Sequence, residues 1–172
     1  MLNKPTFREI YDSHSEMVYN LALNYLQNTQ DAEEVTQDVF VTIHQKIEIF
    51  NNKSSLKTWI YRITINKCLD FIKAKKRQKR FGKMISVFKT EKGEKQIEIP
   101  DFSHPGVLLE DKEEVEFIFS KINELPDKQK SALILKTIEG VSQKEISAVL
   151  GVTEKAIESL LSRARANLKK KL

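Results

Sequence analysis

The residues of this sequence best suited to chemistry are charged side chains, which gather in separate acidic and basic groups. The stretch Asp31 to Phe40 reads DAEEVTQDVF and holds four carboxylates and no basic residue, in a chain of net charge +5. From Lys67 to Lys83 there are eight basic residues and one acid, and a second basic run, Lys169–Lys171, lies near the C-terminal end of the sequence. A basic surplus attracts nucleic-acid phosphates. The separate acidic stretch predicts a second partner that is not nucleic acid.

Other chemistry has little support in the sequence. There is no phosphate-cradling glycine loop, no nucleophile elbow and no metal-ligand spacing, so neither an enzyme nor a cofactor is expected. The three histidines, His14, His44 and His104, are isolated, and the lone Cys68 reads as a core residue. A single cysteine suits a reducing cytoplasm. No apolar run approaches the ~20 residues of a membrane-spanning helix.

The C-terminal basic group lies on a pair of predicted helices. Ser142 and Glu145 have the spacing of a capping box, which predicts a helix starting just after Ser142. Gly151 suits the end of that helix, and Thr153 suits the cap of the next one. A short helix, a glycine turn and a longer helix form a helix-turn-helix.

The second helix of this pair has two distinct faces. Its predicted apolar stripe is Ile157, Leu160, Leu161, Ala164 and Leu168. The opposite face supplies candidate base readers, because the N-terminal part of such a helix meets base edges. These readers are Lys155, Glu158, Ser159 and Ser162. Arg163 and Arg165 on the flanks suit phosphates, whereas a face that only meets solvent is the structural alternative.

The acidic stretch lies on a predicted helix whose other side is apolar. That buried side is predicted to comprise Ala32, Val35, Val39, Ile43, Ile47 and Phe50. Asp31, Glu34 and Asp38 project together from another face. The helix dipole accounts for acids in a first turn but does not extend to Asp38, two turns in. A partner-binding face and a solubilising face are both compatible with this spacing.

The next predicted helix, SSLKTWIYRITINKCLDFIKAKKRQKR, changes character along its length. Its first half offers Leu56, Trp59, Ile60 and Ile63 as core candidates, and its second half is the basic run. Aromatic residues followed by cations suit single-stranded or distorted DNA, where bases stack on rings and phosphates meet charges. The alternative is a charged helix end that enters a linker, with Trp59 in the core.

Taken in order, these stretches resemble bacterial sigma factors of the extracytoplasmic-function group, which contain only regions 2 and 4. DAEEVTQDVF is similar to region 2.2, and FNNKSSLKTWIYRITINKCLDFIKAKKR to regions 2.3 and 2.4. LPDKQKSALILKTIEGVSQKEISAVLGVTEKAIESLLSRARANL is similar to region 4. The resemblance covers nearly the whole chain outside the linker, and the ordered set is more specific than any one piece.

The resemblance implies core RNA polymerase and promoter DNA as partners, with an anti-sigma factor as a further one. It implies that the region 2.2 helix docks on a coiled coil of the polymerase's largest subunit. The polymerase contacts would be Asp31, Glu34, Gln37 and Asp38. It also implies a pocket for a base flipped from the −10 element. The −10 contacts would be Phe50, Asn51, Asn52, Lys53, Ser54, Ser55, Trp59, Asn66, Lys73, Lys76 and Arg77.

In region 4 the resemblance implies contacts to the −35 element. Lys136, Ser159, Arg163 and Arg165 match such positions, beside the readers Lys155, Glu158 and Ser162. Glu158 and Ser162 depart from better-known relatives, which carry a basic and an aromatic residue there. Because glutamate accepts a hydrogen bond from cytosine but repels phosphate, the −35 sequence cannot be transferred from those relatives.

The expected fold class is all-α, with two small helical domains and a flexible linker. Residues 1–85 would form the region 2 bundle, 86–110 the linker and 111–172 the region 4 helix-turn-helix. Proline and glycine gather in the linker segment, where hydrophobic periodicity fades. The rival function is a helix-turn-helix repressor or activator that acts without polymerase and has no use for the acidic face.

Overall fold

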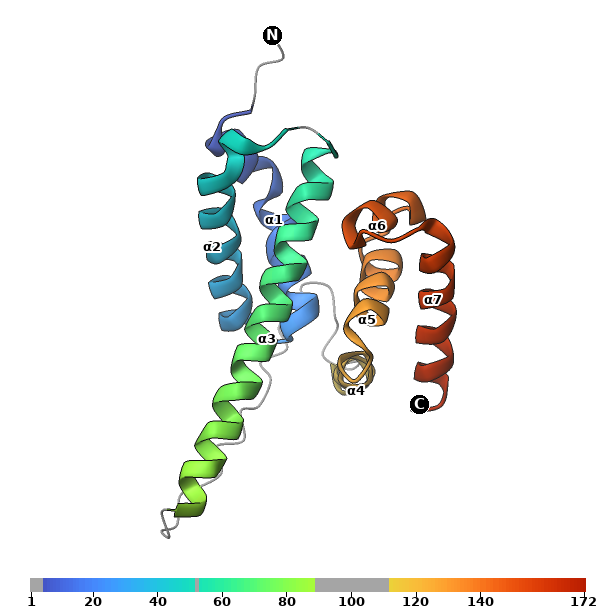
Figure 1. Ribbon diagram of the computed structural model, residues 1–172. Helices are drawn as coiled ribbons and strands as arrows, with labels where there is room; N and C mark the ends of the chain where they lie inside the picture. The colour runs from blue at the N-terminus through green and yellow to red at the C-terminus, as the bar shows by residue number, and fades with distance from the viewer. Residues whose placement is uncertain (1–4, 52, 89–111) are drawn as a thin grey trace.

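The chain folds into helices that form two modules, as the sequence predicts. The computed structural model describes residues 5–51, 53–88 and 112–172, with backbone only for 82–88 and 112. No strand occurs among these residues, which confirms the all-α class (Figure 1). The N-terminal module consists of α1 (Phe7–Leu26), α2 (Thr29–Lys46), the 3-10 turn η1 (Ile47–Ile49) and α3 (Leu56–Phe88). The C-terminal module consists of α4 (Lys112–Asn123), α5 (Asp127–Leu133), the π-helical η3 (Ile134–Ile138), α6 (Gln143–Leu150) and α7 (Glu154–Lys169).

The N-terminal module is a three-helix bundle in which α1, α2 and α3 pack against one another. Helix α1 begins at a capping box, because Thr6 Oγ1 accepts from Glu9 N at 3.3 Å while Glu9 Oε2 accepts from Thr6 N at 2.7 Å. These hydrogen bonds from Thr6 lower the pKa of Glu9. Helix α1 ends at Gln27, a left-handed residue with φ of 57°. The core of the bundle contains Val18, Leu21, Val35, Val39, Ile43 and Ile60.

The predicted apolar faces of this module are largely confirmed. Of the six positions predicted for α2, the four from Ala32 to Ile43 are buried and the last two, Ile47 and Phe50, are half-buried. In α3 only Ile60 among the predicted core positions is fully buried. Tyr61, which the sequence placed between core positions, is only 3% exposed. It is buried because the C-terminal module packs on this part of α3.

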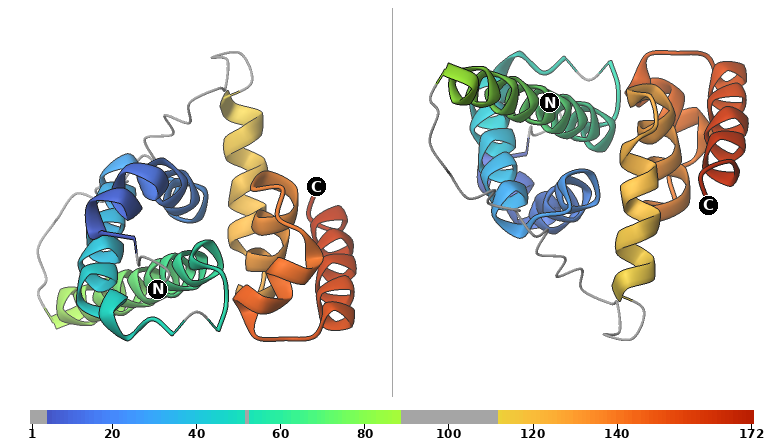
Figure 2. Two further views of the ribbon diagram at one scale, coloured as in Figure 1. Left: turned by 90° about the horizontal axis from the view of Figure 1, so that it is seen from above. Right: turned by 90° about the horizontal axis from the view of Figure 1, so that it is seen from below.

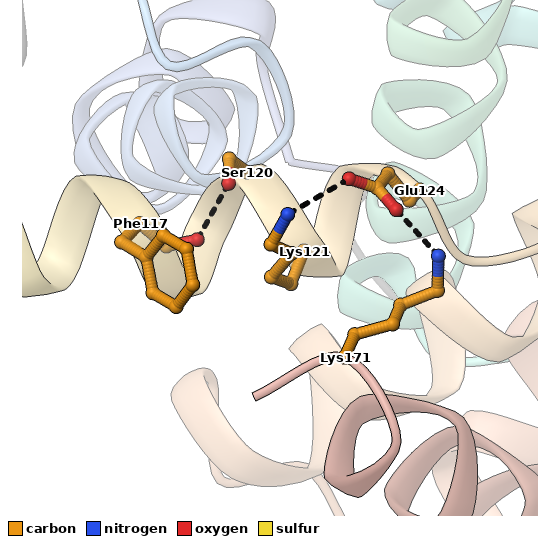
Figure 3. Close-up of polar contacts among 5 residues, drawn as sticks. All are labelled: Phe117, Ser120, Lys121, Glu124 and Lys171. Atoms are coloured by element: carbon orange, nitrogen blue, oxygen red, sulfur yellow. Dashed lines mark hydrogen bonds and ion pairs between the residues drawn. The ribbon is translucent and has the colours of Figure 1, made fainter.

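The C-terminal module packs α7 against α5 and α6. Figure 3 shows how the end of α4 is tied to the C-terminus of the chain: Glu124 pairs with Lys121 at 3.3 Å and with Lys171. Hydrogen bonds from Lys171 and Lys121 lower the pKa of Glu124. Lys121 Nζ also lies 5.1 Å from the centre of the Phe117 ring, and Ser120 Oγ donates to Phe117 O at 2.6 Å. These contacts fix the last turn of α4.

The linker stays a prediction. Helix α3 continues to Phe88, so the first three residues assigned to the linker, 86–88, are helical. Residues 89–111 lie outside those that the structure describes. The two modules are nevertheless in contact, and their buried apolar residues form one continuous cluster in which α6 packs on α3.

Candidate nucleic-acid and protein interface

The helix-turn-helix is built by the caps that the sequence predicts. Ser142 Oγ accepts from Glu145 N at 3.2 Å and Glu145 Oε2 accepts from Ser142 N at 3.2 Å, which closes a capping box at the start of α6. These hydrogen bonds from Ser142 lower the pKa of Glu145. Gly151 ends α6 with φ of 65°, and Thr153 Oγ1 accepts from Ala156 N at 3.2 Å to start α7. The predicted helix-turn-helix is confirmed.

The apolar stripe of α7 holds its other face outward. Ile157, Leu161 and Ala164 are buried, while Leu160 and Leu168 are half-buried against the core. A cleft of about 400 Å³ lies where α7 meets η3 and the start of α6. It is lined by Lys136, Gln143, Glu158, Leu161, Ser162 and Arg165. Four of the predicted −35 residues therefore converge on one cleft, although they come from η3 and α7.

Three further −35 candidates lie outside this cleft. Lys155 and Arg163 are exposed on α7, and Ser159 is half-buried. Gln143, which does line the cleft, was missed by the sequence interpretation. The signal for it was its place as the first residue of α6, directly after the Ser142 cap.

Two aromatic rings form the centre of the −10 candidate site. Phe50 and Trp59 lie 4.9 Å apart between ring centres, tilted by 33°. They line a cleft of about 270 Å³, and its other residues are Lys46, Ile49, Asn51, Lys53, Ser54 and Arg62. Ile49 at its edge is 75% exposed. The structure thus brings together most of the predicted loop residues around a pair of half-buried rings, a surface on which a base can stack.

Two of the predicted loop residues differ from the rest. Ser55 serves the helix, because its Oγ accepts from Thr58 N at 3.1 Å and its carbonyl accepts from Trp59 N. It therefore acts as a cap at the start of α3. Asn52 lies outside the described residues.

Asn66 does not line the cleft around Phe50 and Trp59. It is exposed about two turns along α3, roughly 10 Å from Trp59 at ~1.5 Å per residue. There it borders a smaller cavity of about 150 Å³ with residues of the C-terminal module. Arg62 lines both spaces. The sequence interpretation missed Arg62, although its place between Trp59 and Asn66 at helical spacing puts it on the same face.

The basic run continues along α3 beyond Asn66. Lys73, Lys76 and Arg77 are all exposed, as phosphate contacts require. Lys73 Nζ lies 3.8 Å from Asp127 Oδ2 in a solvent-exposed pair, which contributes little to stability. These side chains can therefore turn toward a phosphate at small cost.

The acidic face of α2 lies beside α3, and its members are not equivalent. Glu34, Gln37 and Asp38 are exposed. The side chain of Asp31 is only 18% exposed, and its Oδ2 accepts from Lys75 Nζ at 2.8 Å. The expectation that Asp31 projects freely with the others is therefore wrong, because this ion pair joins α2 to α3. Asp38 makes a longer contact of 3.9 Å with Lys67 and stays largely open.

An aromatic cleft of about 380 Å³ adjoins the acidic face. Its lining includes Phe7, Tyr11, Phe40, Val41 and His44, together with the predicted contact Gln37. Tyr11 is 47% exposed and Val41 55% exposed. Exposed apolar side chains beside carboxylates are typical of protein interfaces. The sequence signal for this cleft was Val41, which follows Gln37 by one helical turn.

The remaining chemical candidates show no catalytic arrangement. Burial raises the pKa of Cys68 to about 12, so its thiol stays protonated at neutral pH. Within residues 5–51, 53–88 and 112–172, no group of three His, Cys, Asp or Glu side chains is suited to a metal ion. None of the helices in the described part of the chain is long and apolar enough to cross a membrane.

Comparison with known proteins places both modules in one family. The family pattern described as Sigma-70 region 2 matches residues 10–78, and that of Sigma-70 region 4 matches residues 118–168. The chain is 29% identical to the ECF RNA polymerase sigma factor SigW of Bacillus subtilis, over 99% of this chain and 90% of that protein. It is 24% identical to the ECF RNA polymerase sigma-E factor of Escherichia coli, over 99% of this chain and 88% of that protein.

A solved structure shows the same fold. The sigma factor RpoE from Bartonella quintana, solved with the anti-sigma factor NepR, superposes with a TM-score of 0.65 at 22% identity. The match covers 95% of this chain and 94% of the solved one. The two regional matches occur in family order and on the two modules described above. The chain therefore belongs to the sigma-70 family, in its extracytoplasmic-function group, and its function is that of an RNA polymerase sigma factor.

Proposed function

We propose that this sigma factor binds core RNA polymerase through α2, engages the −10 element with α3 and the loop before it, and engages the −35 element with α7. Proteins of this family are DNA-binding initiation factors and not enzymes. One observation carries the proposal: a single chain presents an acidic and aromatic face on α2 in addition to two basic surfaces, on α3 and on α7. DNA repels the first surface and attracts the other two.

The polymerase contact is proposed for Glu34, Gln37 and Asp38. These three side chains are exposed on one side of α2, and Gln37 adjoins the aromatic cleft. Carboxylates at the rim of such a surface steer a basic partner, whereas buried aromatic contacts hold it. Asp31 supports this surface indirectly, because its ion pair with Lys75 holds the start of α2 on α3.

The −10 contact is proposed for the cleft around Phe50 and Trp59. An unstacked base costs a few kcal/mol to extrude, and stacking on aromatic rings offsets part of that cost. Asn66 carries both a donor and an acceptor for a base edge. Lys73, Lys76 and Arg77 would hold the phosphates that follow along α3.

The −35 contact is proposed for the cleft between α7, η3 and the start of α6. Glu158, Ser162 and Arg165 meet Lys136 and Gln143 there, so acceptor and donor groups share one surface. Lys155, Ser159 and Arg163 lie on the same helix outside the cleft. We assign base reading to the cleft and phosphate contacts to the flanking arginine.

The proposal extends to a regulatory partner and to the compartment in which the protein acts. A relative of the same fold was solved with an anti-sigma factor, so we expect this chain to have a protein inhibitor too. Because its proposed partners are core polymerase and promoter DNA, we also place it in the cytoplasm. A single cysteine cannot form a disulfide within the chain, which agrees with a reducing compartment.

Transcription with purified core polymerase tests the function directly. Pooled genomic DNA of the host serves as template, and 5′ ends are mapped with and without the protein. New, discrete start sites that depend on the protein are expected. Specific duplex binding by the free chain, with no new start sites, would instead establish the helix-turn-helix repressor.

A further inference from the structure

A pocket of about 390 Å³ lies where the turn between α1 and α2 meets the second half of α3. Figure 1 shows that α3 continues past this turn, beyond the ends of α1 and α2. Asn123 and Lys130 bound the pocket from the C-terminal module, which lies beside the bundle in Figure 2. Pockets of this size hold small organic ligands. The proposed polymerase and promoter contacts give this pocket no role, although Lys76 in its lining is also a −10 candidate.

The basic residues of α3 occupy two different faces of the helix. Asn66, Lys73 and Arg77 follow one another at helical spacing and share one face. Lys75 and Lys79 are one turn apart and line the pocket. Each stands two residues after Lys73 or Arg77, so each lies ~200° further round the helix at ~100° per residue. A DNA strand that follows Asn66 therefore does not account for the lysines at the pocket.

The lining of the pocket has a surplus of positive charge. Four ammonium groups, those of Lys75, Lys76, Lys79 and Lys130, line it together with one carboxylate, that of Asp31. The Asp31 carboxylate is already engaged, because its Oδ2 accepts from Lys75 Nζ at 2.8 Å. Cations gathered in a concave site with apolar walls attract an anion more strongly than the same charges spread over an open surface. The pocket is therefore suited to an anionic ligand.

Lys130 is a buried charge whose hydrogen bonds are incomplete. Its side chain is only 4% exposed, and burial lowers its pKa to about 8, so the group is still mostly charged at neutral pH. Its Nζ donates to Tyr25 O at 3.0 Å and to Asn123 Oδ1 at 2.6 Å, and both acceptors are neutral. The third N–H of the ammonium has no hydrogen-bond acceptor in the described part of the chain. An anion in the pocket would supply an acceptor and a counter-charge.

The rest of the lining is apolar and indicates what else the ligand contains. Leu26, Phe71 and Ile72 are half-buried walls of the pocket, so part of each side chain remains open to a ligand. An inorganic anion would leave these walls uncovered, whereas a planar ring can pack on them. Lys75 and Lys79 are separated by one helical turn, about 5–6 Å between Cβ atoms, which suits several phosphates in a row better than one. A nucleotide with more than one phosphate combines both properties.

We propose that the pocket between the α1–α2 turn and α3 binds a nucleoside triphosphate, with the base on Phe71 and the phosphates on Lys79 and Lys130. A nucleotide inside a nucleic-acid strand presents the same two groups, a base and a phosphate. The experiment below therefore compares a free nucleotide with a strand. The site does not depend on the proposed contacts of this sigma factor with polymerase or with promoter elements.

Equilibrium dialysis of the full-length protein against ATP, without magnesium and at constant ionic strength, tests the site. One ATP should bind per chain. Lys79→Glu should raise the Kd about tenfold, because it reverses a charge that lines the pocket. Arg80→Glu is the matched control: it makes the same change of charge at the next exposed residue, which does not line the pocket, and its Kd should be nearly unchanged. Inorganic triphosphate should bind about tenfold more weakly than ATP, because it lacks the base.

Three outcomes would overturn the proposal. Equal losses of ATP affinity in Lys79→Glu and Arg80→Glu, with both proteins folded by circular dichroism, would assign the binding to diffuse charge. Equal affinities for ATP and inorganic triphosphate would remove the base from the site. An oligothymidylate without a terminal phosphate examines the other source: if it displaces ATP and its own affinity falls in Lys79→Glu but not in Arg80→Glu, the pocket holds a nucleotide of a strand instead.

Failure of the oligothymidylate to displace ATP supports the free nucleotide. If Lys79→Glu does not fold, Lys79→Gln takes its place, because it removes the charge without reversing it. The start-site experiment with core polymerase is independent of all these results.

Discussion

Glu34 and Asp38 are the carboxylates of α2 whose role in binding can be separated from folding. Both are exposed, whereas Asp31 forms an ion pair with Lys75. Asp38→Lys should weaken binding to core polymerase about tenfold, ~1.4 kcal/mol, because it reverses a charge at a protein interface. The thermal melt should be nearly unchanged. Glu33→Lys, an exposed acid on another side of the same helix, is the matched control, and equal loss in both variants would reduce the effect to net charge.

Asn66 is the residue of α3 whose amide can recognise a base that duplex DNA keeps paired. Asn66→Ala should lower the yield of open complexes, measured as permanganate-reactive thymines, while −35 binding persists. On a template already mismatched in its −10 region, the yield of open complexes should fall less, because the bases there are already unpaired and less free energy is needed to extrude one.

The same variant also tests the structural alternative for Asn66. If the side chain served only to join the helices, the melting temperature would drop and both templates would be affected equally. Because Asn66 is exposed on α3, we expect its replacement by alanine to leave the melting temperature nearly unchanged.

The stability of the helix-turn-helix depends on the residues that cap its helices. Ser142→Ala removes the acceptor for Glu145 N and the partner of the Glu145 carboxylate. The cost should be about 1 kcal/mol of unfolding free energy, measured by denaturant titration. Ser147→Ala is the control, because the Ser147 hydroxyl donates to Lys144 O inside α6 and caps nothing. An equal loss in both would show that the α6 start does not limit stability.

Along α7, affinity and base preference should divide between two residues. Arg163 is exposed outside the cleft, and its replacement by alanine should lower the salt slope of promoter binding by about 1 without changing the preferred sequence. Glu158 lines the cleft, so Glu158→Gln should change the base preference instead. Selection by the holoenzyme from a library randomised over the −35 element measures both. A changed preference in Arg163→Ala would overturn this division.

At the scale of the whole molecule, the sequence predicted only those features that depend on residues close together in the chain. Ser142, Gly151 and Thr153 are recognisable because caps use side chains next to the backbone they satisfy. Nothing near Lys130 in the sequence marks it as buried, since its partner Tyr25 lies 105 residues away. The partial burial of Asp31 was missed for the same reason, because its partner Lys75 is on another helix. The −10 candidates were found by resemblance, but their division between two spaces depends on how the modules pack.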